Sequence, residues 1–241
     1  MRLHVLDHGY IDAVDEPFLT EDGEEELVTT RWIDRCFLID HPDGKLLWDT
    51  GLPEARCPLA FEGTMMVVTT PLLTLLTGLG VRPDEIDYLG FSHMHVDHAG
   101  NANMFAGSTT LMNAREHAFA FGPDAAGVFL PEDYSDLRDG RTILIEDQHD
   151  VFGDGAAIIY AAPGHTVGHQ ILVLTVPEHQ PLILAGDVYY DEADRTHRRA
   201  PEWNADQAES FRTMDRIEAL ATTLNAQLLI HHAAEVPDVW P

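Results

Sequence analysis

Ten short apolar segments recur along this chain of 241 residues, and most of them are bounded by Gly, Pro, Asp or Asn. Three helices are predicted between them, over residues 71–78, 114–121 and 205–224. So many strands with so few helices favour two packed sheets flanked by helices over a parallel doubly wound sheet. The predicted strands are LHVLD, CFLID, KLLWD, DYLGFS, STTLMN, RTILI, AAIIYAA, QILVLTV, PLILAGD and QLLIH.

The helix over residues 205–224 has the clearest pattern. Asn204 is expected to cap its N-terminus, with Gln207 three residues later as in a capping box. Its apolar residues recur at helical spacing, which predicts one face turned towards the core. These residues are Phe211, Met214, Ile217, Leu220 and Leu224.

Two segments lack a clear period. Residues 11–27 are acidic and are predicted to form a solvated loop. Residues 52–70 are predicted to form either a lid or a packed surface loop. No stretch rich in Gly, Ser or Pro divides the chain, so a single domain spanning residues 1–241 is expected.

The chain is strongly acidic, with 41 Asp and Glu against 14 Lys and Arg and a net charge of −27. Such a surface repels polyanions, so no nucleic-acid partner is expected and a nuclease is disfavoured. The apolar runs are too short for a membrane span or a secretory signal, which favours a cytoplasmic protein with no membrane partner. The two cysteines, Cys36 and Cys57, are expected to be reduced thiols.

The segment SHMHVDHAGN, residues 92–101, gathers side chains that bind metals. His93 and His95 are two residues apart and project to the same side of an extended backbone, whereas Asp97 and His98 follow a turn. Four such residues within six positions are too many for one structural zinc ion held by a short loop. They fit better as parts of two adjacent metal sites, each completed from elsewhere.

Further potential ligands stand where other predicted strands end. His165 follows AAIIYAA, Asp187 ends PLILAGD, and His231 and His232 follow the last strand. Strand ends are the usual position for a site built on a rigid scaffold. We therefore predict a centre with two divalent metal ions, for which zinc is favoured and manganese, cobalt or iron are accepted by the same ligand types.

These residues resemble those of the metallo-β-lactamase-fold hydrolases. HMHVDH matches their H-x-H-x-D-H signature, and His165, Asp187 and a late histidine follow in the expected order, so that the resemblance runs from about residue 2 to residue 235. It implies an α+β fold, an αββα sandwich of two mixed β-sheets flanked by helices, with the metals between the sheet edges.

The resemblance also implies how the ligands are divided. His93, His95 and His165 would hold one metal, Asp97, His98 and a C-terminal histidine the other, and Asp187 would bridge them. His232 is preferred for the last ligand, because aligning Ala233 with the acid common in the family puts His232 in the ligand position; His231 stays the alternative. Asp49, in LLWDTGLP, and His169 are expected to have structural roles.

Within this family the chain most resembles the N-acyl homoserine lactone lactonases, through SHMHVDHAGN, PGHTVGHQ, GDVYY and PEWNADQAES. This implies a lactone-opening hydrolase in which Tyr190 hydrogen-bonds the lactone and Asp97 shuttles a proton to the leaving group. An apolar wall would hold the acyl chain. Phe61, Met65 and Met66 are the candidates, with core packing as the alternative for each.

Several rival functions are weighed against this one. A glyoxalase II-like thioesterase needs basic residues near its site, and this chain has few, among them Arg195, Arg198 and Arg199. A lactonase for another small lactone stays open. Diiron redox members of the fold carry glutamate where His95 stands, and a non-catalytic metal-binding scaffold is the remaining alternative. The expected partner is a small acyl lactone, and assembly as a homodimer is left open.

Overall fold

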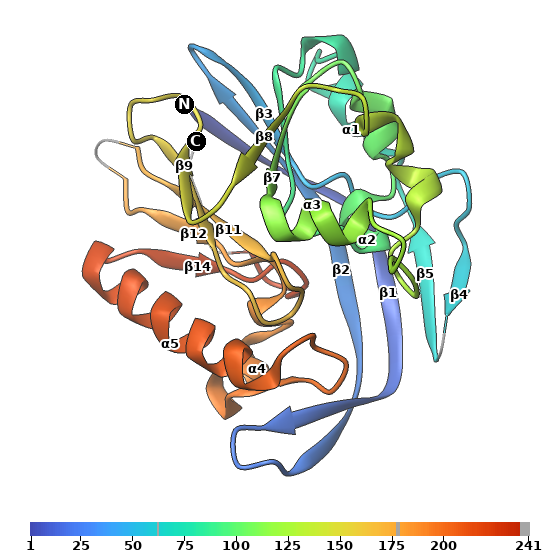
Figure 1. Cartoon of the computed structure of the whole chain (residues 1–241), viewed down its shortest axis with the longest axis vertical. Coiled ribbons are helices and arrows are strands. Elements are labelled where there is room, and N and C mark those ends of the chain that lie inside the picture. Colours follow the sequence, from blue (N-terminus) through green and yellow to red (C-terminus); the bar gives the residue numbers. More distant parts are fainter. Residues whose placement is uncertain (62, 177–178, 237–241) are drawn as a thin grey trace.

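The computed structural model describes residues 1–61, 63–176 and 179–236. Two β-sheets pack against each other, with helices α1, α2 and α3 on the outer side of one and α5 on the outer side of the other (Figure 1). The predicted αββα sandwich of two mixed sheets is therefore confirmed. All ten predicted strands are present, within longer or shorter boundaries.

Nine strands of the described residues form the first sheet, in the order β4-β5-β1-β2-β3-β6-β7-β8, with β13 paired to β1. Pairing is parallel from β3 to β8 and antiparallel elsewhere, so the sheet is mixed. Its strands are β1 (Arg2–Thr20), β2 (Glu25–His41), β3 (Gly44–Trp48), β4 (Leu59–Phe61), β5 (Thr64–Val68), β6 (Tyr88–Gly90), β7 (Thr109–Asn113), β8 (Thr142–Ile145) and β13 (Arg199–Pro201).

The second sheet has five strands among the described residues, in the order β14-β12-β11-β10-β9. Only the pairing of β12 with β14 is parallel in this part of the structure. The strands are β9 (Gln148–Asp150), β10 (Ala157–Ala161), β11 (Gln170–Leu174), β12 (Leu182–Leu184) and β14 (Gln227–Leu229).

The α-helices are α1 (Leu72–Gly78), α2 (Val96–Ala99), α3 (Ala114–Ala120), α4 (Glu192–His197) and α5 (Gln207–Leu224). The capping prediction for α5 is wrong by two residues: Asp206 is the N-cap, and its side chain accepts from the Glu209 N–H at 2.8 Å. Asn204 is instead used by the site described below. No helix of the described residues is long and apolar enough to cross a membrane.

Three apolar layers hold the sandwich together. The middle layer joins the inner faces of the sheets, with Phe37 and Trp48 from the first packed with Leu172 and Leu184 from the second. A second layer lies between the first sheet and its helices. The third lies between the second sheet and α5, where the predicted stripe of Phe211, Met214, Ile217, Leu220 and Leu224 packs. Both sheets are thereby fixed in place, and their edges meet where the ligand candidates lie.

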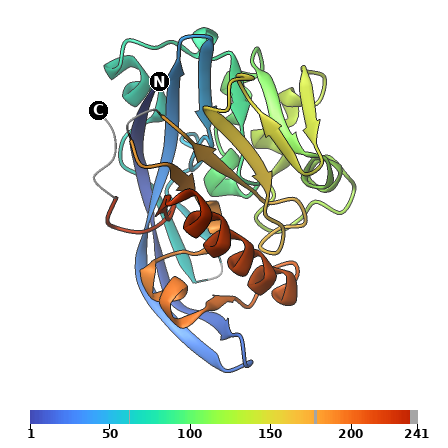
Figure 2. The ribbon, with the colours of Figure 1, turned by 90° about the vertical axis from the view of Figure 1, so that its left-hand side faces the viewer.

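The two segments without a clear period are not loops throughout. Residues 11–20 continue β1 and residues 25–27 begin β2, so most of the expected solvated loop forms a β-hairpin. This hairpin arm reaches the lower end of the molecule, beside α4 and β13 (Figure 2). Ile11, Ala13, Glu16 and Phe18 are buried in the arm, while Val14 and Asp15, at the irregularity between Ala13 and Glu16, are exposed. Residues 52–70 contain β4 and β5, and β5 pairs with β1.

The cysteines are as expected. Cys36 is buried in β2 and Cys57 is half-buried in the connection before β4, and both are free thiols.

Candidate metal centre

A buried aspartate holds the loop that carries HMHVDH. Asp49 directly follows β3, and its two carboxylate oxygens accept from the N–H and the hydroxyl of Ser92 at 2.7 and 2.9 Å. Since β3 and β6 are parallel neighbours, their carboxyl ends meet at one sheet edge, which brings Asp49 beside the start of the loop. Asp49 therefore has the structural contacts expected of it.

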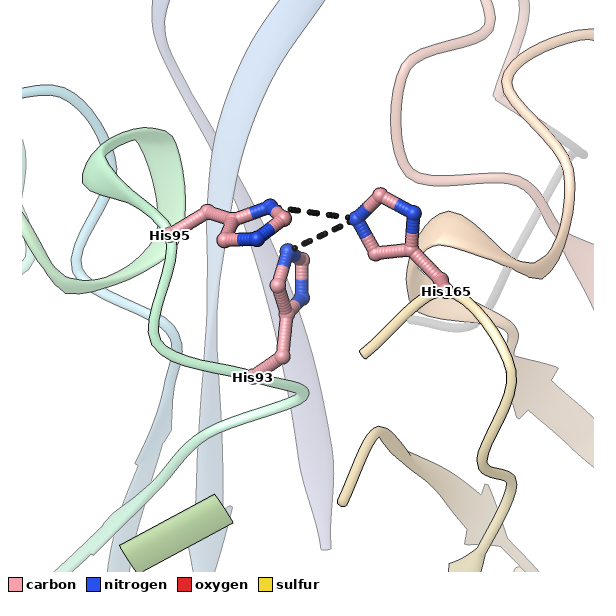
Figure 3. Close-up of side chains that lie close together, drawn as sticks. All are labelled: His93, His95 and His165. Atoms are coloured by element: carbon pink, nitrogen blue, oxygen red, sulfur yellow. Dashed lines mark hydrogen bonds between the residues drawn. The ribbon is translucent and has the colours of Figure 1, made fainter. Parts of the chain in front are cut away.

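His93, His95 and His165 form the first group of converging side chains (Figure 3). His93 and His95 come from one loop after β6, and His165 comes from the loop between β10 and β11 across the sandwich. The His165 Nε2 atom lies 3.2 Å from His93 Nε2 and 3.1 Å from His95 Nδ1. All three side chains are buried.

Asp97, His98, Asp187 and His232 form the second group. Asp187 Oδ1 is 3.2 Å from His98 Nε2 and 3.3 Å from His232 Nε2, and Asp97 Oδ2 is 3.6 Å from each of these nitrogens. The other carboxylate oxygen of Asp187 faces the first group, 3.5 Å from His165 Nε2. Asp187 thus lies between the two groups, and the seven predicted ligand residues are together; their role as ligands stays a prediction.

Three of the imidazoles are oriented by an acceptor on the far side of the ring. In each, Nδ1–H donates to an oxygen, which leaves Nε2 with its lone pair directed into the centre. The acceptors are Asp49 for His98 at 3.0 Å, the Ile33 carbonyl for His232 at 2.8 Å, and Asn204 for His165 at 2.8 Å. The sequence held no sign that Asn204, expected as a helix cap, would orient His165.

The arrangement of these atoms fits a bound cation. Among the described residues, the buried atoms His98 Nε2, His232 Nε2 and Asp187 Oδ1 have no hydrogen-bond partner. His165 Nε2 lies within hydrogen-bond distance of both His93 Nε2 and His95 Nδ1, so either a proton or a cation is needed between these nitrogens. Ligand atoms about 2.0–2.1 Å from a tetrahedral zinc would be about 3.3–3.4 Å apart, close to these separations.

The electrostatics of the centre also favour a positive charge. Burial would raise the pKa of Asp187, but the surrounding imidazoles of His98, His232 and His93 hold that pKa well below its usual value. Burial would likewise lower the pKa of His98, but Asp187, Asp97 and Asp49 raise it well above normal. Three carboxylates, those of Asp49, Asp97 and Asp187, therefore favour a positive charge at this point.

Glu116, on α3, ties the two ligand-bearing loops together. Its buried carboxylate accepts from the Met94 N–H at 3.0 Å, and from the Thr166 hydroxyl and the Gly168 N–H at 2.7 and 3.0 Å. A Cβ added at Gly168 would lie 2.4 Å from the Glu116 backbone nitrogen, so only glycine fits there. Nothing in the sequence singled out Glu116, because a lone glutamate in a helix resembles a surface residue.

The last two histidine candidates differ in what they face. His232 points at Asp97 and Asp187, whereas His231 Nδ1 is 3.7 Å from Asp49 and its ring packs edge-on against Phe37. His169 contacts Asp187 through the backbone, because its Nε2 accepts the Asp187 N–H at 3.0 Å. These contacts favour His232 over His231 as a ligand and give His169 a structural role.

A cavity of about 430 Å³ opens beside the second group. Asp97 and Tyr190 stand at its inner end, where the Tyr190 ring stacks on His232 at 5.1 Å and packs against Trp32 at 4.6 Å. Burial, with Asp187 and Asp97 nearby, raises the pKa of Tyr190 well above normal, so its phenol keeps its proton at neutral pH. This phenol, which also hydrogen-bonds Asp187, is thus a protonated donor in the cavity wall.

The wall of the cavity is mainly apolar. Phe61 and Met66 belong to it, but Met65 does not, since alternate residues of β5 face opposite sides and Met65 is 43% exposed. Sequence reasoning missed most of the wall, which comes from β1, β2 and the segment after α3. The lining residues not foreseen are Ile11, Glu16, Trp32, Thr64, Val96, Phe119, Asp124, Ala126, Gly127, Val128, Phe129 and Trp203.

Comparisons with known proteins agree with this architecture. The chain is 29% identical over 221 residues to the N-acyl homoserine lactonase AttM of Azorhizobium caulinodans, covering 85% of this chain and 82% of that protein. A structure of an N-acyl homoserine lactone hydrolase, with N-hexanoyl-L-homoserine at its catalytic metal centre, superposes with a TM-score of 0.80 at 19% identity, covering 97% of this chain and 93% of the other.

A second solved structure, the dizinc quorum-quenching lactonase AidC, superposes with a TM-score of 0.65 at 17% identity, covering 85% of this chain and 74% of that one. At identities this low, the two superpositions show a shared fold and nothing more. The family model of the metallo-beta-lactamase superfamily matches residues 30–222, which include six of the seven predicted ligands. Because the family model matches most of its length, this chain belongs to the metallo-beta-lactamase superfamily.

Proposed function

We propose that this protein is a dinuclear-metal hydrolase that opens the lactone ring of N-acyl homoserine lactones. The observation that carries the proposal is the cavity: one ligand candidate of each group, His95 and Asp97, lines an apolar pocket whose charged lining residues are acidic. Curated relatives that carry the name N-acyl homoserine lactonase support the same substrate class.

In this proposal His93, His95 and His165 would hold one ion and Asp97, His98 and His232 the other, while Asp187, which lies between the two groups, would contribute to their charge. Zinc suits this set of imidazoles and carboxylates, and manganese, cobalt and iron are accepted by it. When bound, two divalent ions lower the pKa of water towards neutrality and polarise a carbonyl oxygen.

The side chains at the cavity do the rest. Hydrolysis adds water to the lactone carbonyl carbon and breaks the bond to the ring oxygen, which must gain a proton to leave as a hydroxyl group. Tyr190 donates a hydrogen bond to the oxygen on which charge develops. Asp97 faces both the cavity and the ligand atoms, so its carboxylate takes the proton from water and returns it to the ring oxygen. The product is a hydroxy acid.

The lining of the cavity also argues against a glyoxalase II-like thioesterase. Glutathione conjugates carry carboxylates, but the described lining residues include Glu16, Asp97 and Asp124 and no lysine or arginine. The three arginines considered in the sequence are paired elsewhere, Arg195 with Glu218, Arg198 with Glu21 and Asp215, and Arg199 with Asp194 and Glu26. A neutral substrate with an apolar chain fits this pocket better.

The direct test is acid release, followed by pH-stat, from N-acyl homoserine lactones and from S-lactoylglutathione. We expect hydrolysis of the lactones alone, loss of activity on treatment with a chelator, and recovery on adding zinc. The Asp187→Asn variant should lose both activity and one or both ions in metal analysis. Hydrolysis of S-lactoylglutathione at a comparable rate, or full lactonase activity in metal-free protein, would refute the proposal.

A further inference from the structure

Asp194, on α4, is a buried carboxylate that faces the backbone of Tyr190. The residue is only 1% exposed, and its Oδ2 atom accepts from the Tyr190 N–H at 3.1 Å and from the Asp191 N–H at 3.2 Å. Asp191 is the N-cap of α4, and its side chain accepts in turn from the Asp194 N–H at 2.8 Å. The chain between Tyr190 and α4 is therefore closed by reciprocal hydrogen bonds, and one more of them holds a residue of the cavity wall.

Arg199 holds the other oxygen of this carboxylate. Its Nε–H donates to Asp194 Oδ1 at 2.6 Å, and its Nη1–H donates to Glu26 Oε2 at 2.6 Å. Glu26 lies on β2 in the hairpin arm, which runs beside α4 (Figure 2). Charge-assisted hydrogen bonds of this kind are short and directional, so a carboxylate held on both oxygens has little freedom to move. The arm thus fixes Asp194 through Arg199.

The same arm also contacts the side chain of Tyr190. Phe18, on β1, packs edge-on against the Tyr190 ring at 5.7 Å, and Trp32, on β2, packs against it at 4.6 Å. These rings limit the tilt of the phenol, but apolar contacts allow sliding, whereas a hydrogen bond has a preferred direction. Asp194 therefore fixes the backbone of Tyr190, and the rings confine its side chain.

The neighbouring arginine lacks this link. The described salt bridges of Arg198 run to Glu21, at the end of the arm, at 2.8 Å and to Asp215 on α5 at 3.0 Å. Both arginines thus tie the arm to the second half of the chain. Among the described contacts, the tie reaches Tyr190 through Arg199 and Asp194 and not through Arg198.

We propose that Asp194 is a positioning residue for the reaction: its carboxylate, held by Arg199, fixes the backbone of Tyr190 so that the phenol hydroxyl meets the substrate oxygen on which charge develops. This inference rests on the proposed function. A hydrogen bond that strengthens in the transition state is sensitive to small displacements of its donor. Loosening the Tyr190 backbone therefore lowers kcat more than it changes KM.

The test is a double-mutant cycle on the hydrolysis of N-hexanoyl homoserine lactone by zinc-loaded protein. Tyr190→Phe removes the phenol O–H and should lower kcat about 10- to 100-fold. Asp194→Ala removes the acceptor and should lower kcat about 5- to 10-fold, with KM changed less than about twofold. In the Tyr190→Phe background, Asp194→Ala should change kcat less than about twofold, because no hydroxyl is left to position.

Three further variants separate positioning from a loosened fold. Asp194→Asn keeps an oxygen that accepts from the Tyr190 N–H, so its kcat should stay within about threefold of wild type. Arg198→Gln loosens the arm without a described contact to Asp194 and should leave kcat unchanged within about twofold. Arg199→Gln should lower kcat about threefold and, like Asp194→Ala, lose its effect in the Tyr190→Phe background. It supplies the cycle if Asp194→Ala does not fold.

The outcomes distinguish the inference from the function on which it rests. Equal losses of kcat in the two backgrounds would show that Asp194 acts on the fold alone and would overturn the inference. An unchanged kcat in either Asp194→Ala or Tyr190→Phe would overturn it as well, and each of these results leaves a lactonase. Failure of the wild-type protein to open any N-acyl homoserine lactone would overturn the proposed function and this inference with it.

Discussion

Replacing Glu116 should weaken both the fold and the candidate metal centre. Its carboxylate is 1% exposed and accepts three hydrogen bonds, from the Met94 N–H, the Thr166 hydroxyl and the Gly168 N–H. Met94 lies between two proposed ligands, and Thr166 directly follows His165. Glu116 therefore helps to fix the distance between the loop at residues 92–98 and the loop at residues 165–169.

The size of the effect follows from these three bonds. A hydrogen bond to a charged group contributes about 1.5–3 kcal/mol. Glu116→Gln keeps one oxygen, which can serve Thr166 and Gly168, and turns an amide NH₂ towards the Met94 N–H, so the free energy of unfolding should fall by about 2–3 kcal/mol. Glu116→Ala loses all three acceptors and should cost about 4–6 kcal/mol after partial relaxation. Metal affinity should fall about 10- to 100-fold in Glu116→Gln, as for other groups that position ligands.

Urea unfolding of metal-free protein measures the first effect, and competition with a chromophoric chelator measures the second. Glu192→Gln is the matched control, because that side chain on α4 is 67% exposed and its removal should change the unfolding free energy by less than about 0.5 kcal/mol. If Glu116→Gln unfolds with the wild-type free energy and keeps the wild-type metal affinity, Glu116 does not couple the loops.

Three further outcomes are expected. Asn204→Ala removes the acceptor that orients His165 and should lower metal affinity about 10-fold in the same chelator assay. Phe61→Ala widens the cavity and should shift the preferred acyl-chain length in a panel of homologous lactones; an unchanged profile would exclude Phe61 from the acyl wall. Burial, opposed by Arg199, raises the pKa of Asp194 from 3.8 to about 6, so ionisation of this carboxyl destabilises the fold as the pH rises between these values. Metal-free wild type should therefore lose about 3 kcal/mol of unfolding free energy relative to Asp194→Asn between pH 4 and pH 7, and equal pH profiles would contradict this.

The strands that are apolar throughout were predictable from the sequence, whereas the outer part of β1, which contains Asp12, Asp15 and Glu16, was not. LILAGD and QILVLTV lie inside the sandwich and are recognisable from composition alone. In residues 11–20 the buried Ile11, Ala13 and Phe18 are accompanied by the buried Glu16, and an irregularity between Ala13 and Glu16 interrupts the alternation, so the local pattern of this strand is concealed. Strand pairing supplies the stability of this arm, and pairing partners far apart in the chain are not visible in a local pattern.

The ligand candidates were predictable because their residue types are rare and their positions at strand ends are distinctive. The residues around them were not. An asparagine such as Asn204 can cap a helix or accept a hydrogen bond from an imidazole, and only the three-dimensional structure shows which of these roles it has. Met65 and Met66 are adjacent, and which of them faces the cavity depends on the register of β5 against β1. Trp32 lines the pocket because β2 passes beneath it, which a single sequence does not reveal.

The candidate centre takes His93, His95, Asp97 and His98 from the loop that leaves the first sheet, but His165, Asp187 and His232 from the second. His232 is also held by β2, since the Ile33 N–H donates to its carbonyl at 3.0 Å. During translation, three of the five imidazoles, those of His93, His95 and His98, are therefore synthesised long before His165 and His232. With the proposed ligands, the complete set would be available to a metal ion only after translation has passed β14, so we expect loading of the centre to be one of the last events of maturation.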